Sequence, residues 1–159
     1  MEAAKKENLP IAVVQLDVTD DNSIKRAVEQ ILREKGRIDV LVNNAGYGLA
    51  GAFEDSSLDE IEAQYKTNVF GLIRTTQAVL PAMRKQRSGT IVNISSAAGK
   101  VGYPAASVYV STKHAIEGLS ESMAYELEPF GIKVRVVEPG VIKTNFGEGM
   151  IFCQESPGS

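Results

Sequence analysis

Short apolar runs alternate with longer amphipathic segments along most of this chain. The apolar runs fall at residues 9–16, 38–42, 90–94 and 132–137. Between the first two runs, apolar residues recur with helical spacing, at Ile24, Ala27, Val28, Ile31 and Leu32. Strand-like runs that alternate with helical patterns of about 12 to 20 residues indicate βαβ units and a parallel sheet. The 159 residues therefore predict one α/β domain.

Local signals place the ends of three main helices. Asp20 or Asp21 can cap the first helix, and Gly36 can end it. Ser57 and Glu60 have the spacing of a capping box at the start of a long second helix. Pro81 is expected to kink or interrupt that helix near its end. A third helical pattern includes residues 109–127.

Polar and glycine-containing segments follow each predicted strand. These segments contain Asp17, residues 43–46, Ser95 with Ser96, and Pro139 with Gly140. Because ligands of such sheets bind beyond the carboxyl ends of the strands, these segments are the candidate ligand site.

Tyr109 and Lys113 are four residues apart in the third helical pattern. Residues at this spacing lie on one face of a helix, so the lysine ammonium should lie close to the phenol. A neighbouring cation favours the phenolate and lowers the phenol pKa from about 10, so the tyrosine could exchange a proton with an alcohol or carbonyl. Alone, this spacing is weak, because such pairs also arise by chance on exposed helices.

The pair occurs in company that is far more specific. In chain order the sequence has Asn43-Asn44-Ala45-Gly46, then Asn68, Ser95-Ser96, Tyr109 with Lys113, and Pro139-Gly140 followed by Thr144. This set resembles the short-chain dehydrogenase/reductase family. The resemblance implies a partial Rossmann-type, doubly wound parallel sheet of about four strands with three main helices. It places a partial dinucleotide-binding domain at residues 1–146 and a disordered tail at 147–159.

The resemblance implies a catalytic role for four residues. Ser96 would donate a hydrogen bond to the substrate oxygen, and its neighbour Ser95 fits the family spacing less well. Tyr109 would be the general acid or base, and Lys113 would lower its pKa and hold the nicotinamide ribose. Asn68 would interrupt its helix and hold a water that relays protons. The alternatives are that the serines satisfy backbone groups at a strand end and that Asn68 is an exposed helix residue.

The same resemblance assigns a nicotinamide cofactor, NAD or NADP, without selecting between them. The implied cofactor-binding residues are Asp17, Val18, Asn44, Ala45, Gly46, Tyr109, Lys113, Pro139, Gly140, Ile142 and Thr144. Asp17 would contact adenine, although an aspartate after a strand is often only a turn former. The implied reaction is hydride transfer between an alcohol and a ketone or aldehyde, without a metal.

One family motif is missing from this sequence. The family pattern opens with a strand and a Thr-Gly-x-x-x-Gly-x-Gly turn whose N–H groups hold the diphosphate. No such stretch occurs here, and residues 9–16 match the third strand of the family. We therefore expect very weak cofactor binding. We also expect residues 9–16 to move beside residues 38–42 and cover an otherwise exposed edge.

Three interpretations follow for the function. The first is an NAD(P)-dependent alcohol/carbonyl oxidoreductase of this family, truncated at both ends. The second is a catalytically inactive fragment that pairs with a full-length relative. The third is an unrelated α/β binding domain that carries the motifs by coincidence. Tyr103 and Pro104, near the expected substrate side, hint at an apolar substrate such as a lipid, steroid or retinoid-like alcohol.

Composition narrows the partners. The net charge of −3 gives no reason to expect nucleic acid. No run of 18 apolar residues predicts a membrane span, and a single cysteine and a single histidine predict no metal site. Together with the polar N-terminus, these features predict a cytoplasmic protein. In the resembled family the helices that contain Asn68 and Tyr109 commonly form a dimer interface, so a homo-oligomer is expected.

Overall fold

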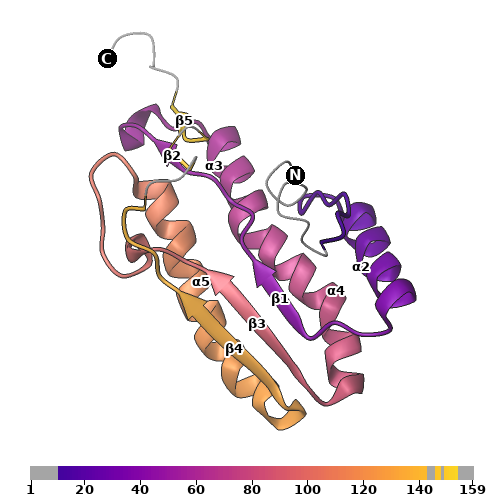
Figure 1. Cartoon of the computed structure of the whole chain (residues 1–159). Helices are drawn as coiled ribbons and strands as arrows, with labels where there is room; N and C mark the ends of the chain where they lie inside the picture. Colours follow the sequence, from indigo (N-terminus) through magenta and orange to yellow (C-terminus); the bar gives the residue numbers. More distant parts are fainter. Residues whose placement is uncertain (1–10, 143–145, 148, 154–159) are drawn as a thin grey trace.

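A computed structural model describes residues 11–142, 146–147 and 149–153 as a parallel sheet packed on helices (Figure 1). The strands of the main sheet are β1 (Val40–Asn43), β3 (Gly89–Ile94) and β4 (Ile132–Val137). The helices are α2 (Asp21–Lys35), α3 (Leu58–Tyr65), α4 (Gly71–Gln86) and α5 (Ser107–Leu127). The three strands are parallel in the order β1-β3-β4. The α/β class and the parallel sheet are thus confirmed.

Helix α2 has the predicted ends. The Asp20 carboxylate accepts a hydrogen bond from the Asn22 N–H at 2.9 Å. At the other end, Gly36 adopts φ 76° and its N–H donates to the Leu32 carbonyl at 2.8 Å. A left-handed residue that closes a helix in this way is normally glycine, because a Cβ is disfavoured there.

Replacing Gly36 by alanine is expected to lower the free energy of unfolding by about 1 kcal/mol, because alanine resists the left-handed conformation. Space is not the cause, since a Cβ at Gly36 would meet no atom within 4 Å. Urea denaturation of the variant measures the change. Gly102→Ala is the control, because Gly102 also has room for a Cβ and its φ is not positive. Equal loss of stability in the two variants would contradict the conformational explanation.

The long second helix is built from three parts. The predicted capping box is present: the Glu60 N–H donates to Ser57 Oγ, and Glu60 accepts from the Ser57 backbone N–H. After α3, a π-helical segment, Lys66–Phe70, leads into α4. Helix α4 continues through Pro81 to Gln86, so Pro81 does not interrupt the helix, and a kink there stays a prediction. Pro81 and Gln77 are exposed, so water can reach the backbone carbonyl of Gln77, which lacks a helical N–H partner because proline has none.

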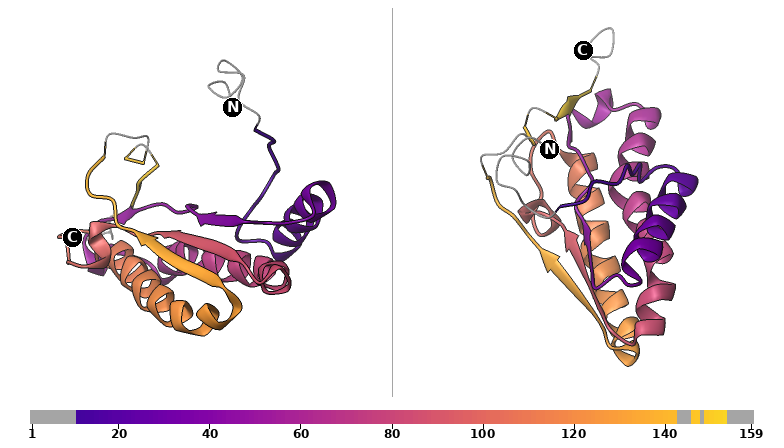
Figure 2. Two further views of the ribbon diagram at one scale, coloured as in Figure 1. Left: turned by 60° about the horizontal axis from the view of Figure 1, so that its bottom comes forward. Right: turned by 45° about the vertical axis from the view of Figure 1, so that its right-hand side comes forward.

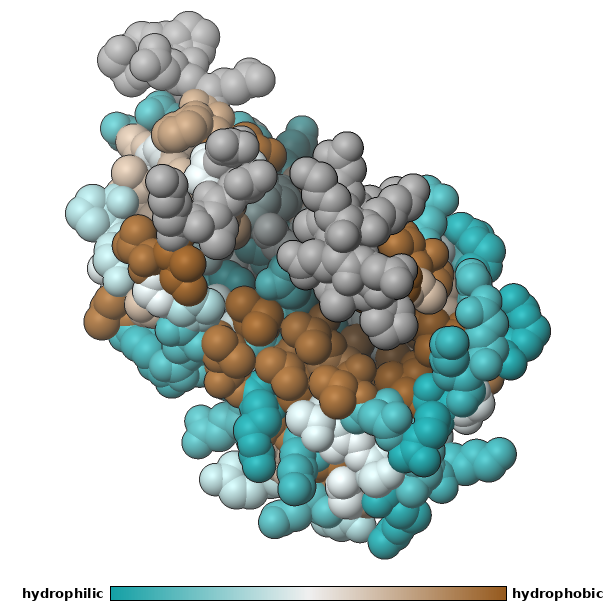
Figure 3. All heavy atoms as spheres, in the orientation of Figure 1, coloured by the Kyte–Doolittle hydropathy of each residue, from teal (hydrophilic) through white to brown (hydrophobic). Residues whose placement is uncertain are grey.

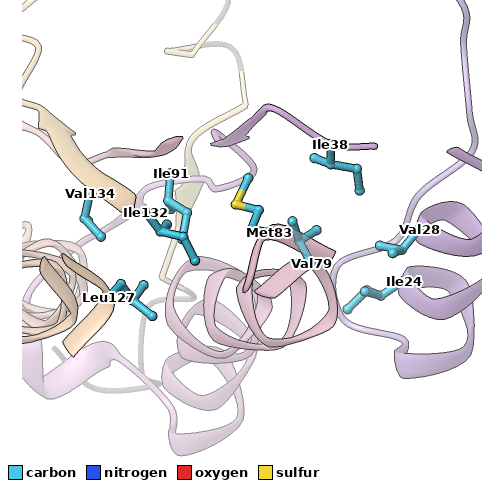
Figure 4. Close-up of a cluster of buried hydrophobic side chains, with 9 residues drawn as sticks. All are labelled: Ile24, Val28, Ile38, Val79, Met83, Ile91, Leu127, Ile132 and Val134. Atoms are coloured by element: carbon cyan, nitrogen blue, oxygen red, sulfur yellow. The ribbon is translucent and has the colours of Figure 1, made fainter. Parts of the chain in front are cut away.

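The hydrophobic core lies between the sheet and its helices. Met83 and Val79 of α4 pack between the strand residues Ile91 and Ile132 on one side and Ile24 of α2 on the other (Figure 4). Helices α4 and α5 lie on the same face of the sheet, as the left view of Figure 2 shows. The core is therefore one layer of side chains between one sheet face and one layer of helices.

The other face of the sheet is exposed and partly apolar: valines of β1 lie on it, whereas β4 also places Lys133 and Arg135 there. Val40 and Val42 of β1 are each 55% exposed, and Val137 of β4 is 44% exposed. Figure 3 shows apolar side chains gathered over the strands on this face. Because β1 lies at one side of the sheet and pairs with β3 alone among the described residues, its outer edge is unpaired there.

The prediction of a strand at residues 9–16 is wrong for residues 11–16, the part of this segment that the structure describes. Residues 11–16 form no strand and pair with none, and Ile11 and Val13 are 58% and 64% exposed. The proposal that this segment moves beside β1 is wrong as well for residues 11–16, because β1 pairs only with β3 in the part of the chain that the structure describes. Alternating apolar residues favour a strand only where a neighbouring strand and a core receive them. Residues 9 and 10 lie outside the described residues.

The described residues also form a second, two-stranded sheet, separate from the main sheet and not predicted from the sequence. It pairs β2 (Leu49–Ala50) with β5 (Ile151–Phe152) in parallel. The Ile151 N–H donates to the Gly48 carbonyl and the Cys153 N–H to the Ala50 carbonyl, both at 2.8 Å. Since β5 lies within the predicted disordered tail, that expectation was wrong for residues 151–152. The domain boundary at residue 146 stays a prediction.

No helix among the described residues is long and apolar enough to cross a membrane.

Candidate active site

The loops that carry the predicted site follow the carboxyl ends of the three parallel strands. In the sheet register Asn43 lies opposite Asn93, and Ile94 lies opposite Val137. The carboxyl ends of the three strands therefore lie side by side at one end of the sheet. Two backbone hydrogen bonds extend the contact beyond β3 and β4: Ser95 N–H donates to Val137 O at 2.8 Å, and Ala97 N–H donates to Pro139 O at 3.0 Å.

A buried chain of polar side chains holds these strand ends against α4 and α5. Asn43 Nδ2 donates to Thr76 Oγ1 at 3.0 Å and to Asn93 Oδ1 at 2.9 Å. Asn93 Nδ2 donates to Ser120 Oγ at 2.8 Å, and Ser120 Oγ donates to the Ile116 carbonyl at 2.6 Å. Sequence reasoning missed this network. Its signal was an asparagine in each of two adjacent apolar strands, since a buried amide needs partners.

Asn68 fastens the loop after β1 to helix α5. It lies in the π-helical segment and is only 2% exposed. Its Oδ1 accepts from the Tyr47 N–H at 3.1 Å, and its Nδ2 donates to the Tyr47 carbonyl at 2.9 Å and to Thr112 Oγ1 at 3.3 Å. The helix is thus locally interrupted at Asn68, and the alternative of an exposed helix residue is excluded. Its role in holding a water stays a prediction.

Lys113 is the buried residue of the candidate site. Its side chain comes from α5, the residue is 7% exposed, and Nζ donates to the Ile94 carbonyl at 2.8 Å. Nζ is 5.6 Å from the centroid of the Tyr109 ring. Burial lowers the pKa of Lys113 from 10.5 to about 8, and the nearby carboxylate of Glu117 opposes this shift. The lysine is therefore poised to lose or gain a proton near neutral pH.

The buried Lys113 makes stability depend on pH. Below pH 8 the lysine is protonated in the folded and unfolded protein, so the full cost of burying its charge is present. Between pH 8 and 10.5 the folded protein releases the proton first, so stability rises with pH. We expect the unfolding free energy of the wild type to increase relative to Lys113→Met over this range in denaturation series. Lys133→Met, at an exposed lysine of β4, is the control. A difference between wild type and Lys113→Met that is constant with pH would contradict the lowered pKa.

The pKa of Tyr109 differs from the sequence expectation. Burial raises it above 10, and a hydrogen bond with the Ser96 side chain only partly opposes the rise. The expected lowering by Lys113 was wrong for this structure. The ammonium lies over the ring, and its described hydrogen bond goes to the Ile94 carbonyl rather than to the phenol oxygen. Desolvation therefore outweighs the attraction of the cation.

The two neighbouring serines occupy different environments. Ser95 is 3% exposed, and its hydroxyl is 3.5 Å from the Lys113 carbonyl. Ser96 begins the short helical turn Ala97–Gly99, where its Oγ accepts from the Ala98 N–H at 3.1 Å, and its side chain lies near enough to Tyr109 to lower the pKa of that phenol. The structure therefore brings Ser96, Tyr109 and Lys113 together, whereas the Ser95 side chain is buried in the protein interior.

The predicted adenine-side residues show a less specific arrangement. Asp17 Oδ1 accepts from the Thr19 N–H at 2.8 Å and from the Thr19 hydroxyl at 2.7 Å, which lowers the pKa of Asp17. These contacts fit the turn-former interpretation. Val18 packs on Gly71, where a Cβ would lie 2.7 Å from its Cγ2.

The remaining predicted cofactor residues lie around the strand ends. Asn44, Ala45, Gly46, Gly140 and Ile142 are exposed there. Pro139 accepts the hydrogen bond from Ala97 described above. Thr144 lies outside the described residues. The cofactor roles of this set stay predictions.

A segment near the C-terminus covers part of the site, and sequence reasoning missed it. The Phe146 ring lies 5.8 Å from the Tyr109 ring, centroid to centroid, at 51°. Met150 contacts the position of Gly48, where a Cβ would meet its Cε at 3.5 Å. The only signal was the apolar character of Phe146 and Met150.

A groove between α2 and α4, lined by Ile24, Val28 and Arg74 among others, contains none of the site residues.

Comparison with known proteins places this arrangement in a family. The family model described as short chain dehydrogenase matches residues 1–150. A 3-ketodihydrosphingosine reductase of Bacteroides thetaiotaomicron is 48% identical over 136 residues, which are 86% of this chain and 51% of that protein. Retinol dehydrogenase 8 of Homo sapiens is 44% identical over 158 residues, which are 98% of this chain and 50% of that protein.

Solved structures agree with these relatives. A short-chain dehydrogenase from Streptomyces avermitilis matches with a TM-score of 0.89 and 44% identity, over 98% of this chain and 58% of that one. ElxO with NADP bound matches with a TM-score of 0.83 and 36% identity, over 89% of this chain and 60% of that one. The chain spans about half the length of the curated relatives it matches. On the match of the family model, this chain belongs to the short-chain dehydrogenase family.

Proposed function

We propose that this chain is an NAD(P)-dependent oxidoreductase that transfers hydride between an alcohol and a ketone or aldehyde. The observation that carries the proposal is the half-buried Tyr109 phenol, whose pKa is influenced by the nearby Ser96 side chain and which has the buried Lys113 one helical turn away. The family match and relatives that include two enzymes named for carbonyl or alcohol substrates support it.

The nicotinamide end of a cofactor fits the residues that are present. Lys113 Nζ has three N–H donors, and its described hydrogen bond uses one of them, toward Ile94 O. The remaining donors suit the hydroxyls of a ribose. The exposed segment around Gly140 and Ile142 offers backbone groups beside the same strand ends. A bound nicotinamide supplies or accepts the hydride.

The protein residues would move the proton. In reduction, Ser96 donates a hydrogen bond to the carbonyl oxygen, and Tyr109 gives that oxygen its hydroxyl proton as the carbon receives the hydride. In oxidation, Tyr109 takes the proton of the alcohol as the hydride leaves the carbon. Because burial raises the Tyr109 pKa, its protonated form dominates at neutral pH, which suits the general acid of the reduction.

We propose an apolar alcohol or carbonyl as the substrate. Phe146 lies against Tyr109, and Tyr103, 48% exposed, lies in the loop that follows Ser96. The relatives named for ketodihydrosphingosine and retinol act on apolar molecules. The homo-oligomer through the helices that contain Asn68 and Tyr109 and the cytoplasmic location stay predictions, and NAD is not distinguished from NADP.

The test is oxidation or reduction by the purified chain, followed through cofactor absorbance, with long-chain and short-chain alcohols and ketones. The proposal expects turnover that is faster with the long-chain compounds. Absence of turnover with every compound and with both cofactors would contradict it.

A further inference from the structure

Lys100 joins three segments that surround the site. It follows the Ala97–Gly99 turn that Ser96 begins. Its Nζ is 3.0 Å from Glu117 Oε2 and 3.3 Å from Glu138 Oε1. Glu117 lies one turn beyond Lys113 on α5, and Glu138 immediately precedes Pro139. We call these two ion pairs the Lys100 bridge.

The Glu117 end of the bridge is largely removed from water. The Glu117 side chain is 15% exposed, and its Oε1 is buried without a hydrogen-bond partner among the described residues. It also packs against Gly99, where a Cβ would lie 3.0 Å from both Glu117 Cγ and Oε1. A carboxylate with so little solvent is strongly destabilised if its partner cation is removed.

The bridge reinforces backbone contacts between the same segments. The Ala97 N–H donates to the Pro139 carbonyl, and the Lys100 N–H donates to the Ala97 carbonyl, both at 3.0 Å. One end of the loop is thus fixed by the backbone, and the other end by Lys100. The carboxylates of Glu117 and Glu138 both raise the pKa of Lys100, so the ammonium stays charged at neutral pH.

We propose that Lys100 is a positioning residue that holds the loop bearing Ser96 against α5 and the end of β4. The inference rests on the proposed function, since it concerns the placement of Ser96 relative to Tyr109 and Lys113. Lys100 itself is 54% exposed at its side chain and touches none of those three side chains in the described contacts.

Amide hydrogen exchange tests the bridge without any turnover. We expect Lys100→Met to speed exchange at Ala97 and Ala98 by about tenfold, an effect between those of exposed and buried ion pairs. Lys100→Arg should restore slow exchange, because the guanidinium keeps the charge. Lys133→Met is the control, at an exposed lysine of β4. Unchanged exchange in Lys100→Met, or equal acceleration at Ile91 in the core, would overturn the proposal.

Kinetics then connect the bridge to the reaction. In a chain that turns over substrate, Lys100→Met should lower kcat by about tenfold, the upper effect of a partly exposed charged group. The KM for the cofactor should stay unchanged, and Lys100→Arg should recover kcat. A change confined to KM would overturn the positioning role. If the wild type shows no turnover, the proposed function fails, and the exchange result alone decides whether Lys100 positions the loop.

Discussion

Replacing Tyr109 by phenylalanine is expected to lower kcat by about a hundredfold to ten thousandfold, the range that general acid–base groups contribute. The change removes only the phenol hydroxyl. The ring keeps its contact with Phe146 and its place beside Lys113, so packing and binding should change little. Turnover of the variant with the best substrate of the wild type measures the effect.

Tyr125→Phe provides the matched control for this prediction. Tyr125 lies on the same helix and is 73% exposed, so loss of its hydroxyl should leave kcat unchanged. Equal activity of Tyr109→Phe and the wild type would show that another group transfers the proton. A decrease in both variants would point to a general effect on α5.

Replacing Asn68 by aspartate is expected to lower the free energy of unfolding by about 3 kcal/mol at pH 7. The Asn68 amide donates to the Tyr47 carbonyl and to Thr112 Oγ1. An ionised carboxylate cannot donate, so its oxygen would face the Tyr47 carbonyl as a buried, unpaired charge. Chemical denaturation at pH 7 measures the loss.

The pH dependence separates charge from shape in this variant. Burial raises the pKa of the new carboxyl above the ordinary 3.9 of an unfolded aspartate. At pH 4 the neutral acid can still donate one hydrogen bond, so the gap to the wild type should be small and should widen toward pH 7. Asn44→Asp is the control, because Asn44 is exposed and the same change introduces no buried charge there. A gap that does not change with pH would indicate a steric cause instead.

The sequence predicted those parts of the fold that local rules determine. The caps of α2 at Asp20 and Gly36 and the capping box of α3 depend on residues within one turn of each other, and all three were confirmed. The position of the site, beyond the carboxyl ends of the strands, was predicted from the parallel direction of the strands. That Asn68 interrupts its helix was implied by the family resemblance rather than by a local rule, and the π-helical segment includes it.

The errors arose where the outcome depends on distant parts of the chain. Residues 11–16 have strand-like composition, but no described strand pairs with them. The pairing of β2 with β5 joins segments about a hundred residues apart and leaves no periodic signal. The Tyr109 pKa depended on how deeply the ring is buried, which the i, i+4 spacing to Lys113 does not reveal. The Lys100 bridge likewise unites three segments that are not adjacent in sequence.

We propose above that Lys113 and Tyr109 form the nicotinamide end of a cofactor site. The most direct test is a fluorescence titration of the monodisperse chain with NADH and NADPH, beside Lys113→Met and the control Lys133→Met. We expect weak but saturable binding of at least one cofactor, with a Kd on the order of 1 mM, or about −4 kcal/mol. Binding should be lost in Lys113→Met and kept in Lys133→Met. No saturation in the wild type, or equal binding by Lys113→Met, would show that these two residues do not form a cofactor site.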